Sequence, residues 1–158
     1  MSNAPDMKLL QQAIVESVSE SLETMAFSEA AAMNVAVAQG ALMGSMATRG
    51  VSIPVDSPFS ATLSIFYSPD LAIDLMTAMY GGAVPDGMDE NAVAQDVMNE
   101  FVNTFVGRMI CTIHPESPAM KLGFPAPIDH TEKETVLPSD CAAAFDIGGK
   151  LMLVRARM

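Results

Sequence analysis

The sequence predicts an α+β fold in which helices flank an antiparallel sheet. Residues 7–27 and 89–113 repeat apolar side chains at spacings of three and four, which is typical of amphipathic helices. Runs of alternating residues follow one another without a helix between them, and such neighbouring strands pair antiparallel. The last two runs flank Gly148-Gly149. Because a type I′ turn needs positive φ at both central positions, these glycines predict a C-terminal β-hairpin.

The composition is that of a folded domain with an acidic surface. A chain of 158 residues fits one domain, 1–158, at roughly 100–200 residues per domain. Half of the residues are apolar and 17% are charged, which excludes an intrinsically disordered chain. The net charge of −11, from 19 acidic and 8 basic residues, disfavours binding to nucleic acid or an anionic membrane. A partner with a basic patch is compatible with it.

The cysteines and the N-terminal residues indicate neither a metal site nor export. Cys111 and Cys141 belong to no metal-binding motif, and we interpret both as small buried hydrophobic residues. The chain shows no signal peptide and no apolar run of about 20 residues, so we expect a cytoplasmic protein. Residues 1–6 are expected to be flexible or derived from a tag.

The first part of the chain contains the first helix and two predicted strands. The helix over 7–27 begins after Pro5-Asp6, a suitable start signal. Residues 28–40 are rich in alanine and predict neither helix nor strand. Residues 41–55 are interpreted as an interrupted strand that Pro54 ends. Residues 59–67 alternate clearly and predict a strand.

The middle of the chain contains two predicted helices. Ser68 and Pro69 form a helix start, and Gly81-Gly82 ends the helix that follows. The longest periodic segment runs from 89 to 113, where the prolines that follow end it.

The last part of the chain is predicted to be mostly strand. Residues 119–124 are interpreted as a short strand and 126–139 as a loop. The closing hairpin is expected to pair residues 142–147 with 150–157.

The helix over 89–113 carries the polar pattern that points to a function. At about 100° per residue, four of its residues lie within roughly 60° of one another, opposite the apolar arc. They are Asp96, Glu100, Asn103 and Gly107. Asn competes for backbone hydrogen bonds, and Gly costs about 1 kcal/mol relative to Ala in a helix interior. A merely solvated face would favour Lys, Glu, Gln or Ala, so this stripe suggests an amide presented to a closely approaching partner.

The pattern D-x-x-x-E-x-x-N-x-x-x-G, from Asp96 to Gly107, resembles the active-site helix of the CheC/CheX/FliY chemotaxis phosphatases. The resemblance extends to the opening helix that ends near Glu23, to the strand and helix of residues 60–81, and to the Gly123-Phe124-Pro125 turn with the closing hairpin. Residues 16–23 of the first helix offer glutamates without the matching asparagine. The resemblance therefore implies the CheX-like branch, with a single site, a helix-flanked antiparallel sheet and frequent homodimers.

The same resemblance implies a phosphatase that acts on a phosphorylated CheY-type response regulator. Asn103 is the candidate for positioning the attacking water, because a carboxamide both accepts and donates hydrogen bonds and carries no charge. Glu100 is expected to contact the lysine beside the regulator's phosphorylated aspartate. Asp96 is expected to influence docking, and Gly107 to permit close approach. The chain itself is expected to hold no metal or cofactor, since Mg²⁺ belongs to the regulator.

A second reading of the same residues is a non-catalytic module of the same fold. Such a module would bind a response regulator or a second copy of the chain without useful turnover. The presence of Asn103 beside Glu100 favours the enzyme, since a scaffold has no need of the amide. The expectation of a homodimer also rests on the edge that the final hairpin would expose.

Overall fold

A computed structural model describes residues 4–82, 84, 86–116, 119–128 and 136–158. Its elements, in chain order, are α1 (Met7–Ala26), β1 (Ala31–Met33), α2 (Val35–Met43), β2 (Arg49–Ser57), β3 (Ala61–Tyr67), α3 (Pro69–Met79), α4 (Glu90–Ile113), β4 (Lys121–Leu122), β5 (Ala126–Ile128), β6 (Cys141–Ile147) and β7 (Lys150–Arg157). Among the described residues, no helix is long and apolar enough to cross a bilayer.

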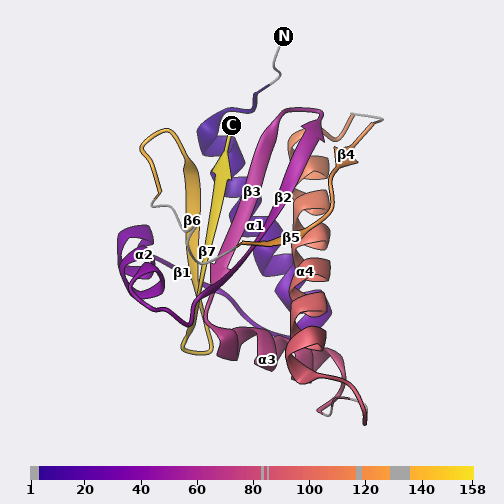
Figure 1. The fold of residues 1–158 in the computed structure, drawn as a ribbon. Coiled ribbons are helices and arrows are strands. Elements are labelled where there is room, and N and C mark those ends of the chain that lie inside the picture. The colour runs from indigo at the N-terminus through magenta and orange to yellow at the C-terminus, as the bar shows by residue number, and fades with distance from the viewer. Residues whose placement is uncertain (1–3, 83, 85, 117–118, 129–135) are drawn as a thin grey trace.

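The strands form one antiparallel sheet in the order β1-β6-β7-β3-β2-β4, and β5 also pairs with β2. Figure 1 shows α1 and α4 behind this sheet, α3 at its lower end, and α2 beside β6 and β7. The predicted class, a helix-flanked antiparallel sheet, is confirmed.

The main core lies between the sheet and the layer of α1, α3 and α4. Both faces of β3 are buried, because Phe66 faces a smaller cluster under α2 while Leu63 and Ile65 face the main core. α4 packs along α1, and Phe101 and Phe105 of α4 are fully buried with ring centroids 5.4 Å apart. The long helix is thereby held by its apolar side, which leaves the opposite side at the surface.

The closing hairpin has the predicted turn but a shorter free edge than predicted. Gly148 and Gly149 have φ of 61° and 86°, as a type I′ turn requires. However, β6 pairs with β1 on one side, and β7 pairs with β3 on the other. The exposed edge expected for the hairpin is therefore shortened, because β1 pairs with residues 144–146 of β6 and β3 pairs with β7, and the homodimer stays a prediction.

The helix starts follow the sequence signals. Asp6 accepts hydrogen bonds from the backbone N–H groups of Lys8 and Leu9 at the start of α1, and Asp89 accepts one from Asn91 at the start of α4. Ser68 occupies the N-cap position of α3, but its side chain makes no capping hydrogen bond.

The segment between α1 and β3 departs from the sequence prediction. Residues 28–40, left unassigned, contain β1 and most of α2. Residues 41–43, predicted as strand, complete α2, whose start is capped by Asn34. β2 begins only at Arg49 and continues through Pro54 to Ser57. Pro54 does not end the strand, because its carbonyl still accepts a hydrogen bond from Gly123 at 2.8 Å.

The segment after α4 also contains one strand more than predicted. The strand expected over 119–124 is confirmed as β4, reduced to two residues. The prediction of a loop over 126–139 is wrong for residues 126–128, which form β5 and pair with β2. Pro127 is tolerated there because β5 pairs with a single neighbour, as an edge strand does. Residues 129–135 of the predicted loop lie outside the described residues.

Candidate functional site

The predicted site residues all lie on the exposed side of α4. Asp96, Glu100 and Asn103 are exposed, and Gly107 is half-buried. The residues between them include Val97, Phe101 and Phe105, which are buried in the main core. The helix therefore brings the four residues onto one face, which we call the α4 stripe, and it fixes them by the packing of its opposite face.

The polar side chains of the α4 stripe have no partner within the described part of the chain. Asp96, Glu100 and Asn103 form neither a hydrogen bond nor an ion pair there through their side chains. Their neighbours differ: Asn99 accepts a hydrogen bond from Gln95, at 3.0 Å. An exposed amide and carboxylate that the fold itself does not use are free to bind a partner.

Contacts on either side of the α4 stripe hold the helix in place. On the α1 side, Arg108 reaches Glu20 at 3.5 Å and Thr24 at 3.3 Å. On the other side, the chain that returns through β4 brings the Met120 side chain next to Gly107. A Cβ added to Gly107 would lie 3.9 Å from the Met120 Cε, an ordinary van der Waals distance.

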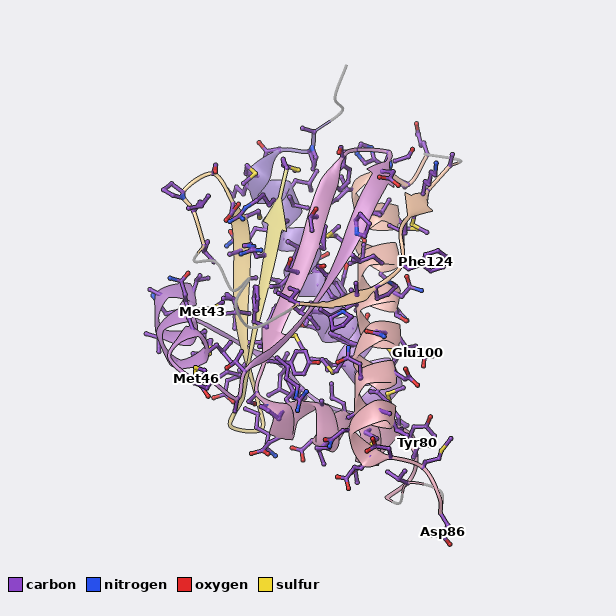
Figure 2. All side chains as sticks on the ribbon, in the orientation of Figure 1. Met43, Met46, Tyr80, Asp86, Glu100 and Phe124 are labelled. Atoms are coloured by element: carbon purple, nitrogen blue, oxygen red, sulfur yellow. The ribbon has the colours of Figure 1, made fainter. Side chains whose placement is uncertain are left out.

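Two large apolar side chains on the segment that returns from α4 through β4 to β5 were missed by the sequence analysis. Met120 is 47% exposed and Phe124 is 92% exposed. Figure 2 shows Phe124 and Glu100 projecting from the same margin of the molecule, the margin formed by α4. A signal was available for Phe124, because a large apolar residue between Gly123 and Pro125 stands in a turn, where the core does not need it.

The α4 stripe is a convex helix surface. A hollow of about 670 Å³ lies away from it, lined by the turn of the closing hairpin, by α3 and by residues 28–31. A small-molecule site usually buries most of its ligand in a cleft, so this surface suits a macromolecule that supplies the concave side.

The α4 stripe shows neither a metal-binding cluster nor an activated thiol among the described residues. Among the described residues, no three His, Cys, Asp or Glu side chains gather to hold a metal ion. Burial raises the pKa of the Cys141 thiol to about 11, which keeps it protonated and unreactive. Cys111 was expected to be buried and is instead exposed, on α4 one turn after Gly107, so that part of the interpretation is wrong.

The comparisons with known proteins identify the fold. No family model matches the chain, and no curated protein matches its sequence. Among solved structures, the chemotaxis protein CheX from Vibrio vulnificus has a TM-score of 0.71 at 17% identity, with 98% of this chain and 99% of that chain covered. CheX from Borrelia burgdorferi, solved in a CheX–CheY–BeF3–Mg²⁺ complex, has a TM-score of 0.65 at 14% identity over 92% and 95% of the two chains.

A more distant neighbour is FliY from Thermotoga maritima, with a TM-score of 0.59 at 11% identity over 98% and 91% of the two chains. CheX, CheC-like and FliY proteins are thus the structural neighbours of this chain. The expected resemblance to that group, including CheX proteins at TM-scores of 0.71 and 0.70, is confirmed at the level of the fold.

Proposed function

We propose that the chain is a phosphatase that hydrolyses the aspartyl phosphate of a CheY-type response regulator. The observation that carries the proposal is the exposed pair Glu100 and Asn103, one turn apart on α4 and unused by the described part of the fold. The fold shared with CheX proteins, one of them solved in complex with CheY, supports it. A cytoplasmic location belongs to the same proposal.

The reaction needs positioning more than covalent chemistry. Water attacks the phosphorus, the bond from phosphorus to the aspartate oxygen breaks, and the products are a free carboxylate and inorganic phosphate. Phosphoryl transfer of this kind is accelerated mainly by orienting the nucleophile in line and by stabilising charge. In this proposal Asn103 orients the water, because its amide oxygen accepts a hydrogen bond from it. The NH₂ of the same side chain donates toward a phosphoryl oxygen.

Glu100 contributes electrostatic complementarity. Its carboxylate is placed to pair with a lysine beside the regulator's phosphorylated aspartate, and a carboxylate–ammonium hydrogen bond is about twice as strong as a neutral one. Asp96, one turn earlier, extends the acidic surface of the docking face, and Gly107 lets the partner approach the helix backbone. The Mg²⁺ ion of the reaction is held by the regulator in this scheme.

The test of the mechanism is the rate of phosphate loss from a panel of phosphorylated receiver domains. We expect the wild-type chain to accelerate loss from at least one receiver. Asn103→Ala should reduce the stimulated rate by about a hundredfold or more, the usual cost of losing a positioned catalytic dipole. Asn103→Asp should be at least as damaging, because it keeps the shape of the side chain and adds a charge that repels the phosphoryl group.

The matched control is Asn91→Ala, which removes an exposed asparagine from the first turn of the same helix. It should leave the rate unchanged. Stimulation that survives in Asn103→Ala would contradict the mechanism. Tight binding of a receiver without stimulated hydrolysis by the wild type would favour the non-catalytic module instead.

A second pair of variants tests Glu100. Glu100→Gln keeps the shape of the side chain and removes the charge, so we expect KM for the phosphorylated receiver to rise about tenfold. Glu23→Gln, an exposed glutamate on α1, is the control and should leave KM unchanged. Equal KM values for Glu100→Gln and wild type would remove the proposed contact with the regulator's lysine.

A further inference from the structure

The segment that returns from α4 through β4 to β5 carries two exposed apolar side chains, and one of them lies against the α4 stripe. Met120 lies next to Gly107, with its Cε 3.9 Å from the position a Cβ would take there. Phe124 follows four residues later and is 92% exposed. In Figure 2 it extends from the same margin as Glu100. We call Met120 and Phe124 together the apolar patch.

The backbone that carries Phe124 is fixed on both sides. Leu122 pairs with Val55 in β4, and Ala126 pairs with Ser52 in β5. Between them the Gly123 N–H donates to the Pro54 carbonyl at 2.8 Å. A Cβ at Gly123 would lie 2.3 Å from the Pro54 ring, so only glycine allows this approach. Phe124 is therefore presented to solvent by an ordered strand connection.

A partner that touched only the α4 stripe would bury too little surface. A specific protein interface of standard size covers about 800 Å² on each partner, and one face of three helical turns is smaller than that. The footprint must extend sideways from the helix. Toward α1 the stripe is bordered by the Arg108–Glu20 contact, whereas toward β4 it is bordered by Met120 of the apolar patch. Aromatic side chains and methionine are enriched at protein interfaces relative to the rest of the surface, and large side chains that become buried there carry much of the binding energy.

We propose that the apolar patch is the docking anchor for the phosphorylated receiver domain, which would present an apolar surface beside its phosphorylated aspartate. This inference rests on the proposed function, because it takes the α4 stripe as the centre of the same interface. Phe124 and Met120 are positioning residues in this scheme. They hold the receiver so that Asn103 meets the phosphoryl group, and they do not touch the reacting atoms.

The test separates docking from chemistry. Phe124→Ala and Met120→Ala are compared with wild type for KM and kcat toward the receiver that is dephosphorylated fastest, and for Kd toward the same receiver activated by beryllofluoride and Mg²⁺. Phe124→Ala should raise KM and Kd roughly tenfold to a hundredfold, from the apolar area it removes, and leave kcat unchanged. Met120→Ala should have a smaller effect in the same direction, and Phe124→Leu should restore part of the affinity.

The control is Met46→Ala, which removes an exposed methionine from the opposite margin of the molecule in Figure 2. It should change neither constant. Because Phe124 is almost fully exposed, its variants should keep the circular dichroism and the thermal midpoint of the wild type, so that a loss of affinity is not a loss of fold.

The outcomes distinguish this inference from the proposed function. If the wild type is active and Phe124→Ala has unchanged KM and Kd, the proposed docking role of the apolar patch is wrong and the proposed phosphatase activity stands. A receiver that binds without turnover would overturn the hydrolysis, and its Kd would still decide the role of Phe124. A chain that forms dimers in wild type and monomers in Phe124→Ala, with receiver affinity unchanged, would assign the patch to a second copy. Failure to bind any receiver would overturn both proposals.

Discussion

Single residues on α4 divide into those that pack in the core and those that the fold leaves exposed. Phe101 and Phe105 on one face are fully buried, whereas Glu100 and Asn103 on the other make no intramolecular side-chain contact of a polar kind with described residues. Asn99, between these two faces, is committed to Gln95. Substitutions at Glu100 and Asn103 should thus change the interaction with a partner and leave the free energy of unfolding of the chain nearly unchanged.

Gly107 gives the clearest test at this scale. The fold of the chain does not require glycine at position 107, because an added Cβ would meet only the Met120 side chain, at 3.9 Å. Gly107→Ala should therefore increase the free energy of unfolding by up to about 1 kcal/mol, from helix propensity. The same methyl group should weaken receiver docking if the partner approaches the helix backbone there. Thermal unfolding and receiver titration measure the two effects, and a stabilised variant with undiminished affinity would remove Gly107 from the interface.

Among the elements, the closing strand and the loop before β6 are joined by a half-buried ion pair. Asp140, whose side chain is 1% exposed, accepts from the Arg157 Nε at 2.9 Å, from its Nη2 at 2.7 Å and from the Leu137 N–H at 2.8 Å. The hydrogen bonds from Arg157 are the largest cause that holds the pKa of Asp140 below its usual value. The carboxylate form is thus favoured by folding.

Asp140→Asn should reduce the free energy of unfolding at pH 7 by about 1.5–3 kcal/mol, the range for hydrogen bonds to a charged group. Because the folded pKa is lowered, this stabilisation is present above the unfolded pKa of about 3.9 and is lost as the pH falls through the lower folded value. Denaturant titrations of both proteins between pH 7 and pH 2 should therefore converge at the acid end. Asp86→Asn, at an exposed turn, is the control. If the difference in the free energy of unfolding between wild type and Asp140→Asn stayed constant with pH, the stabilising role of the Asp140 carboxylate would be contradicted.

The elements also show what a single sequence could predict. α4 and the closing hairpin were predictable because their signals are local: a capping Asp89, a long apolar period, and two adjacent glycines. β1 was not, because it is three residues long and forms only by pairing with β6, far along the chain. Within the site, Asn103 was visible as an unusual residue for a helix interior. The exposure of Phe124 was hidden, because it depends on how β4 and β5 attach to β2.

Taken as a whole, the molecule has many more carboxylates than cations that could pair with them. The net charge is −11, and ion pairs in the described residues join Arg108 to Glu20, Lys150 to Asp74 and Arg157 to Asp140. Several of the few cations are thus already occupied. Mutual repulsion among the remaining carboxylates opposes the compact state, and it acts over a Debye length of about 10 Å at 0.1 M salt.

Screening this repulsion should stabilise the protein at neutral pH. Raising NaCl from about 10 mM to about 0.5 M at pH 7 shortens the Debye length several-fold, and we expect the thermal midpoint to rise by roughly 2–4 °C, which corresponds to ~1 kcal/mol for a chain of this length. Near pH 4.3, where the net charge approaches zero, the repulsion is largely gone and the same salt step should have little effect. Calorimetry at the two pH values provides the comparison. An equal rise at both would mean that salt acts through general exclusion from the surface, and that the acidity of the chain serves its partners without a cost to its fold.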